Sequence, residues 1–167
     1  MQTKELLRHV EYNAWATRRL QPAITSLSFD EFHKNFGGSF GSIHGTCVHL
    51  AGVAELWYSR WNGTSPLKLA SADAFPQDAA QLFERWNRID AEIVHFVRSL
   101  ADPAREISMT NTSGKSFIHS YSDMILHFVN HQSYHRGQLT LYLRQLGKEA
   151  PAQDLIYYIR EKNHSLA

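Results

Sequence analysis

Apolar residues recur every three or four positions along four long stretches of the chain, which is the spacing of one face of an α-helix. In the first stretch Leu6, Val10, Ala14, Leu20 and Ile24 share such a face. The pattern predicts helices over residues 4–27, 42–61, 78–100 and 121–146, with a short last helix over 153–162. Ser42 is the expected N-cap of the second helix. Four long amphipathic helices in a chain of this size predict an all-α four-helix bundle.

The segments between these helices predict how the bundle is connected. Residues 62–77 are rich in Gly, Pro, Ser and Asp and predict a loop. A helix of ~20 residues is ~30 Å long, and ~15 extended residues reach ~50 Å. The loop is therefore long enough to return along the bundle and leave the second and third helices parallel. Before the fourth long helix, two short runs flank the turn-forming residues 111–114, which predicts a small hairpin.

Composition narrows the class of protein. The chain has 167 residues, expected to form one domain over 1–167, with 43% hydrophobic residues, 20% charged residues and a formal net charge of +1. No basic tract is present, so we expect no nucleic-acid partner. No apolar run reaches 18 residues and no signal peptide is visible, so we expect no membrane span and a cytoplasmic location. The single cysteine, Cys47, excludes an internal disulfide and is expected in the core.

Histidine supplies the candidate chemistry, because the chain carries ten of them and three are spaced four residues apart. On a helical wheel His135 points into the core, His131 lies at its near edge and His127 lies well off it. The wheel therefore favours the pair His131 and His135 as metal ligands. Two imidazoles at i and i+4 on one helix face bind a single ion in known metal sites. Such a pair also occurs in helices that bind no metal, and that reading stays open here.

A third ligand is expected from another helix, since two imidazoles rarely suffice. His49 shares a face with Val53 and Leu56 and is favoured, with His44 as the next candidate. Glu55 shares the face of His44 and is a candidate partner for the N–H of a ligand ring. Arg136 follows a predicted ligand and is expected either to bind an anionic substrate group or to form a surface ion pair.

Several segments resemble one known family, including LLRHVEYNAWATRRL, residues 6–20, which is similar to the opening of that family. The segment HFVNHQSYHRGQLTLYLRQLG, residues 127–147, is similar to the last core helix of the DinB/YfiT-like family of metal-dependent four-helix-bundle proteins. GSIHGTCVHLAGVAELWYSRW, residues 41–61, resembles the second helix of that family, and DLIYYIRE, residues 154–161, resembles its C-terminal segment. The resemblance implies an up-down-down-up helix order, a homodimer and a divalent metal held by His49, His131 and His135. Glu55, His127, Arg136 and Gln138 are then candidate outer-shell or substrate contacts.

The resemblance also suggests a class of reaction. Members of the wider group include S-transferases that use bacillithiol, mycothiol or glutathione, and a mycothiol-dependent maleylpyruvate isomerase. Three neutral imidazoles leave a Zn, Ni or Fe ion with open positions, where a thiol is deprotonated or water becomes more acidic. We therefore expect an enzyme that activates a low-molecular-weight thiol toward an electrophile, as an S-transferase does, or water, as a hydrolase does. The alternative is a metal-binding stress-response protein without turnover.

Overall fold

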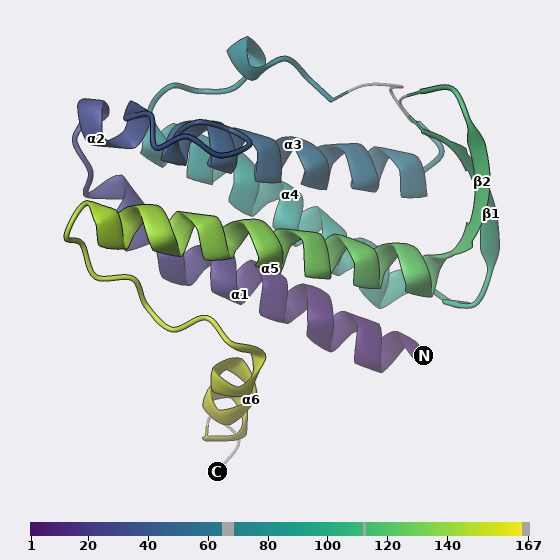
Figure 1. The fold of residues 1–167 in the computed structure, drawn as a ribbon. Helices are drawn as coiled ribbons and strands as arrows, with labels where there is room; N and C mark the ends of the chain where they lie inside the picture. Colours follow the sequence, from purple (N-terminus) through teal and green to yellow (C-terminus); the bar gives the residue numbers. More distant parts are fainter. Residues whose placement is uncertain (65–68, 112, 165–167) are drawn as a thin grey trace.

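Four long helices pack side by side in the computed structural model, which describes residues 1–64, 69–111 and 113–164 (Figure 1). They are α1 (Thr3–Thr25), α3 (Ile43–Trp61), α4 (Ala79–Ser99) and α5 (Tyr121–Gln145). Helices α1 and α3 each pack against both α4 and α5. The predicted four-helix bundle is therefore confirmed, with α1 diagonal to α3.

The order of helix directions follows from the connections. Helices α3 and α4 run in the same direction, whereas α1 and α5 run the opposite way (Figure 1). The connection between α3 and α4 runs back along the bundle, as its length predicts, and includes a short 3-10 turn, η1 (Ala72–Ala74). This is the up-down-down-up arrangement. Residues 65–68 of the predicted loop lie outside the described residues.

Two smaller elements complete the predicted set. Strands β1 (Glu106–Thr110) and β2 (Ser116–Ser120) pair antiparallel, with Ser108 opposite Ile118, and form the expected hairpin at one end of the bundle. Thr112 in its predicted turn lies outside the described residues. Helix α6 (Leu155–His164) begins two residues later than predicted and packs against α1.

A short helix, α2 (Phe29–His33), was not predicted. Five residues are too few to show helical periodicity. The local signal is instead a capping box, in which the Ser28 side chain accepts from the Glu31 N–H and the Glu31 side chain accepts from the Ser28 N–H. Ser42, Asp78 and Ser120 cap the longer helices α3, α4 and α5 in a similar way through their side-chain oxygens.

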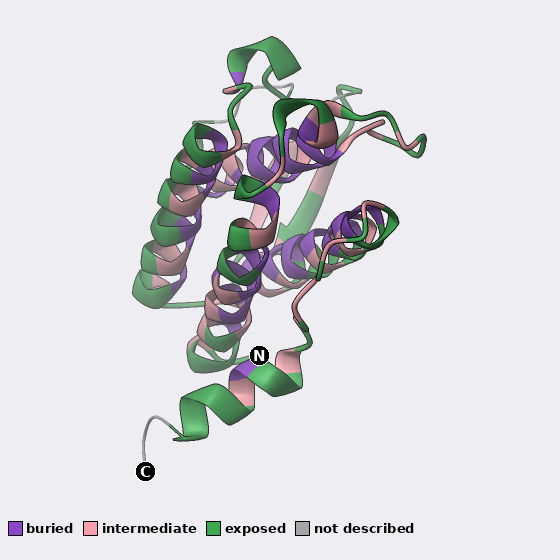
Figure 2. Cartoon of the chain, turned by 90° about the vertical axis from the view of Figure 1, so that its left-hand side faces the viewer, coloured by how far each residue is buried: buried purple, intermediate pink, exposed green. Residues whose placement is uncertain are grey.

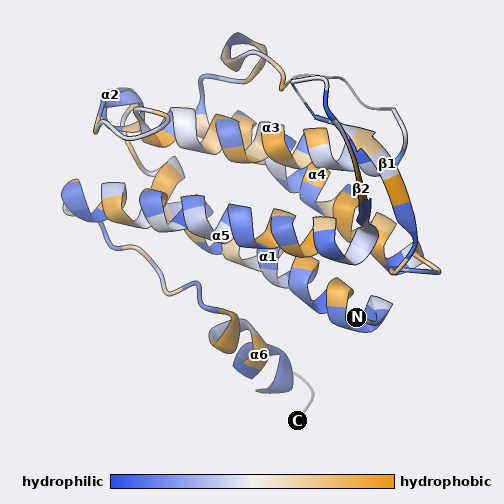
Figure 3. Cartoon of the chain, turned by 45° about the vertical axis from the view of Figure 1, so that its right-hand side comes forward, coloured by the Kyte–Doolittle hydropathy of each residue, from blue (hydrophilic) through white to orange (hydrophobic). Residues whose placement is uncertain are grey.

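The buried faces of the four long helices turn toward one another and form a core in two parts (Figure 2). One apolar cluster includes Phe128 at the hairpin end, and the other includes Trp86 and the fully buried Cys47 at the α2 end. A set of buried polar residues lies along the same helices between the two clusters: Asn13, Thr17, Asp90, Gln132 and Arg136. Every long helix carries both hydrophobic and hydrophilic positions (Figure 3), and none of the described helices has the length and apolar character to cross a lipid bilayer.

Candidate metal centre

Three histidines from two helices converge on the polar middle of the bundle. His49 comes from α3, and His131 and His135 come from successive turns of α5. One ligand nitrogen from each ring lies within 4.8 Å of the others, and the Nε2 atoms of His49 and His131 are 3.3 Å apart. The pair that the helical wheel favoured therefore meets the predicted third histidine.

The donor set fits a divalent metal ion. Imidazole nitrogens bind zinc at about 2.0–2.1 Å, so two such ligands of a tetrahedral ion lie about 3.3 Å apart. The His49–His131 separation already has this value. The buried Nδ1 atom of His131 finds no hydrogen-bond partner among the described residues. An ion bound at Nε2, the His131 atom that faces His49, would therefore leave Nδ1 without an outer-shell acceptor among the described residues.

The surroundings keep two of the rings neutral. The pKa of His49 is lowered to about 4, chiefly by burial and also by the neighbouring rings of His135 and His131. Burial likewise lowers the pKa of His131 to about 4, with His135 and His127 contributing. A metal binds the deprotonated imidazole, so neither ring needs to lose a proton near neutral pH before it can act as a ligand.

Gln138 orients the third ring. Its Oε1 atom lies 3.1 Å from Nδ1 of His135, one turn back along α5. In the tautomer that makes this hydrogen bond, Nδ1–H donates and Nε2 keeps its free lone pair. Contacts of this kind fix the orientation of metal-binding histidines. Gln138 therefore occupies one of the predicted outer-shell positions.

The aromatic ring of Phe40 covers the cluster, and the sequence analysis did not identify it. It stacks on His49 with ring centroids 3.8 Å apart and meets His135 edge-on at 5.2 Å. The loop that carries Phe40 crosses the first turn of α3 so closely that a Cβ atom on Gly45 would lie 2.1 Å from the Phe40 carbonyl oxygen. Phe40 itself follows Gly38 and precedes Gly41, both at positive φ. The sequence signal that indicates such a cover is an aromatic residue between two turn-forming glycines, just before a helix that carries a ligand.

The other predicted contacts point elsewhere. Glu55 accepts two hydrogen bonds from Arg85 on α4, at 2.6 and 2.8 Å, so its carboxylate is engaged away from the triad. Arg136 is buried and donates to Asn13 on α1 and to Ser133, rather than facing the histidines. His127 packs edge-on against Trp57, and its ring centroid is 6.1 Å from that of His131.

His44, the second candidate for the third ligand, is also turned away from the triad. Its Nε2 atom lies 3.1 Å from the carbonyl oxygen of Pro76, and its ring packs against His33 and Phe32. The choice of His49 over His44 therefore agrees with the positions of both rings.

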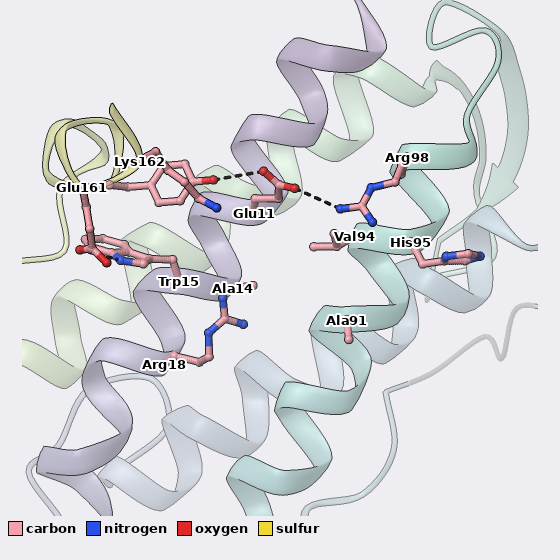
Figure 4. A pocket seen from close by; sticks show the side chains of 11 residues that line it. Glu11, Ala14, Trp15, Arg18, Ala91, Val94, His95, Arg98, Glu161 and Lys162 are labelled. Atoms are coloured by element: carbon pink, nitrogen blue, oxygen red, sulfur yellow. Dashed lines mark hydrogen bonds and ion pairs between the residues drawn. The ribbon is translucent and has the colours of Figure 1, made fainter. Parts of the chain in front are cut away.

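A cavity of about 560 Å³, shown in Figure 4, has no triad residue in its lining. It lies between α1, α4 and α6. Glu11 accepts hydrogen bonds there from Arg98 and from the Tyr158 hydroxyl, and Trp15 donates to Glu161. Since these groups already bind one another across the space, its size does not identify it as the reactive site.

Comparison with known proteins places the chain in a family. The DinB family model matches residues 1–164. Protein DinB of Bacillus subtilis (strain 168) is 25% identical over 156 residues, covering 89% of this chain and 90% of that protein. A crystal structure of a DinB-like protein from Bacillus cereus superposes with a TM-score of 0.68 at 18% identity, covering 89% of this chain and 95% of the other.

A second solved structure shares the fold. YfiT from Bacillus subtilis, described as a probable metal-dependent hydrolase with an unusual four-helix bundle topology, superposes with a TM-score of 0.71. The two chains are 13% identical over 89% of this chain and 91% of YfiT. The bundle is thus shared with both solved structures, and the match of the family model over nearly the whole sequence shows that this chain belongs to the DinB family.

Proposed function

We propose that the protein is a divalent-metal-dependent enzyme whose ion is held by His49, His131 and His135. The observation that carries this proposal is the convergence of three imidazoles from α3 and α5, with ligand atoms within 4.8 Å of one another. Sites with three protein ligands and open positions are typical of catalytic rather than structural metals. The description of YfiT as a probable metal-dependent hydrolase supports the same class of reaction.

The residues around the triad have separate tasks in this proposal. A bound divalent ion would act as a Lewis acid that makes water or a thiol nucleophilic at neutral pH. Gln138 holds the His135 ring in one orientation. Phe40 covers one side of His49 and limits the access of bulk water to the rings. A half-buried position strengthens electrostatic interactions with a substrate relative to water.

The first test is the metal content of untagged protein by mass spectrometry. We expect about one equivalent per chain in the wild type and little in His49→Ala or His135→Ala. His127→Ala is the matched control, because this histidine lies on the same helix and points toward Trp57. Retention of full metal by both ligand variants, or loss of metal in the control alone, would contradict the assigned triad.

A second test separates the possible nucleophiles. The metal-loaded wild type and His131→Ala are compared in the hydrolysis of p-nitrophenyl acetate and in the conjugation of bromobimane with bacillithiol, mycothiol or glutathione. Metal-dependent ester hydrolysis without thiol supports a hydrolase, and thiol-dependent conjugation supports an S-transferase. A stoichiometric metal with neither reaction above the variant would favour the non-catalytic alternative.

The homodimer implied by the family resemblance stays a prediction. Light scattering after size exclusion would measure the mass in solution against the 19.2 kDa of one chain.

A further inference from the structure

A cavity of about 250 Å³ opens beside His49 on the outer side of α3. His49 is part of its wall, so the cavity reaches one of the three triad rings. Phe40, Val48 and Leu69 supply its apolar sides, and Gly52 lies at its base. We call this space the α3 pocket.

Among the described residues, the α3 pocket has an uncharged lining. Its walls are Phe, Val, Leu, Ala and Gly side chains, and His49 is the single titratable residue among the described residues that line it. A charged group would lose its hydration there without gaining a partner, whereas a hydrocarbon or aromatic group would be stabilised by leaving water. The chemistry of the pocket therefore favours an uncharged apolar ligand.

The size of the pocket limits that ligand. A cavity of about 150 Å³ is enough to hold benzene in a protein interior. The α3 pocket is larger, at about 250 Å³, and matches a single substituted ring or a short alkyl chain. A Cβ atom on Gly52 would lie 3.3 Å from Cζ of Phe75 and 3.7 Å from Cδ2 of Leu69, so the absence of a side chain at Gly52 provides the space.

Phe75, which packs beside Gly52, is itself held in place. Phe75 is 4% exposed, and the guanidinium of Arg85 lies 3.9 Å from the centre of its ring. Arg85 is in turn bound to the Glu55 carboxylate. Leu69, at the rim, is 40% exposed, although burial would favour its apolar side chain. A ligand in the pocket would cover part of that exposed surface.

We propose that the α3 pocket binds an uncharged aromatic or alkyl group of the substrate while the polar end of the same molecule lies at the triad. This inference rests on the proposed function, because the triad must hold the metal that receives the polar end. A second cleft of about 340 Å³ is lined by Trp57, Asp123 and His127 among others. No triad residue lines that cleft, so a group bound there would not lie against a triad ring.

The test uses two zinc-binding probes with the same head group. Acetohydroxamic acid and benzohydroxamic acid both chelate through the hydroxamate and differ only in a methyl or phenyl substituent. Isothermal titration calorimetry on zinc-loaded wild type is expected to show benzohydroxamic acid binding at least about tenfold more tightly. We call the dissociation constant of acetohydroxamic acid divided by that of benzohydroxamic acid the affinity ratio. In Gly52→Val and Leu69→Asp the affinity ratio is expected to fall toward one, while the affinity for acetohydroxamic acid stays unchanged.

Two variants and one control keep the outcomes distinct. Leu69→Asp alters a rim residue that is 40% exposed, so its folding does not depend on repacking of the core around Gly52. Trp57→Ala alters the other cleft and is expected to keep the wild-type ratio. Loss of the ratio in Trp57→Ala alone, or a ratio near one in the wild type with zinc bound, would overturn the inference and leave the proposed function standing. Failure to bind zinc at all, measured beforehand by mass spectrometry, would overturn both.

Discussion

Asp90 lies in the middle of α4, 2% exposed, between the two apolar clusters of the core. Neither of its carboxylate oxygens has a well-formed hydrogen bond among the described residues, because the nearby Thr17 hydroxyl donates to the carbonyl oxygen of Asn13 and only slightly lowers the pKa of Asp90. Burial raises the pKa of this carboxyl from 3.8 to about 7, and the positive charges of Arg136 and Arg18 only partly oppose the effect. Asp90→Asn keeps the shape of the side chain and removes its ability to ionise. We expect the effect of this substitution on stability to depend strongly on pH.

The direction and size of the pH dependence follow from the two pKa values. Asp90 holds its proton to higher pH in the folded protein than in the unfolded chain, so its contribution to stability is complete below pH 4. That contribution is lost as the pH rises through 7. A tenfold change in an acid dissociation constant corresponds to about 1.4 kcal/mol. A rise in the pKa of Asp90 from 3.8 to about 7 therefore lowers the free energy of unfolding by about 4 kcal/mol at high pH. About 2–3 kcal/mol of it falls between pH 5 and pH 8.

The assay is urea unfolding of wild type and Asp90→Asn at pH 5, 6, 7 and 8, with a chelator present throughout. The folded pKa values of His49 and His131 are lowered to about 4, so both proteins lose stability as the pH falls from 6.5 toward 4. This common effect cancels in the difference between the two free energies of unfolding. We expect that difference to shift in favour of the variant by about 2–3 kcal/mol from pH 5 to pH 8. A constant difference, or a shift that favours the wild type at high pH, would refute the reasoning and indicate that the Arg136 charge stabilises an ionised Asp90.

Three further predictions concern the site and its cover. Gln138→Ala is expected to keep one metal equivalent but to bind that metal about 10–100-fold more weakly, measured in competition with a chromophoric chelator, and Gln138→Glu should restore most of the lost affinity. Equal metal affinities in the wild type and Gln138→Ala would exclude the orienting role. Zinc at a hundred times its dissociation constant is expected to raise the free energy of unfolding of the wild type, measured by denaturant titration, by about 2.7 kcal/mol. The increase in His131→Ala should be much smaller, and equal increases would mean that zinc binds elsewhere. Gly45→Ala is expected to lower the free energy of unfolding by about 1–3 kcal/mol in a thermal unfolding experiment, although alanine has the better helix propensity. The reason is that its Cβ would meet the Phe40 carbonyl oxygen at 2.1 Å. An unchanged melting temperature would show that the loop moves freely.

The bundle was predictable because its helices are long and amphipathic. Ser42 precedes a run of apolar residues with helical spacing, and the structure starts α3 directly after this cap. The positions of His131 and His135 followed from their angle to Phe128 and Leu139 on the same helix. His49 followed from the face it shares with Val53 and Leu56. In each case the deciding information lies within one helix.

The remaining features depend on contacts between segments, which periodicity does not describe. Glu55 and Arg85 are 30 residues apart and lie on different helices, so no local pattern pairs them. Arg136 turns to Asn13, 123 residues away. Asp90 is an intermediate case, since Trp86 and Ile93 lie on its own helix face and already indicate that its carboxyl is buried. The burial of Asp90 is therefore predictable from the sequence, whereas its lack of a hydrogen-bond partner is not.

The histidines of the triad are divided between helices that are far apart along the chain. His49 and His131 are separated by 82 residues, with all of α4 and the hairpin between them. Contacts of such long range form late, because the entropy of closing the intervening loop is lost before the contact exists. During synthesis on a ribosome, His49 therefore emerges well before His131 and His135 and has neither of them as a neighbour at that stage. Assembly of the three rings is thus expected late in folding, so a metal bound by the triad would be drawn from the ions around the finished bundle rather than around the growing chain.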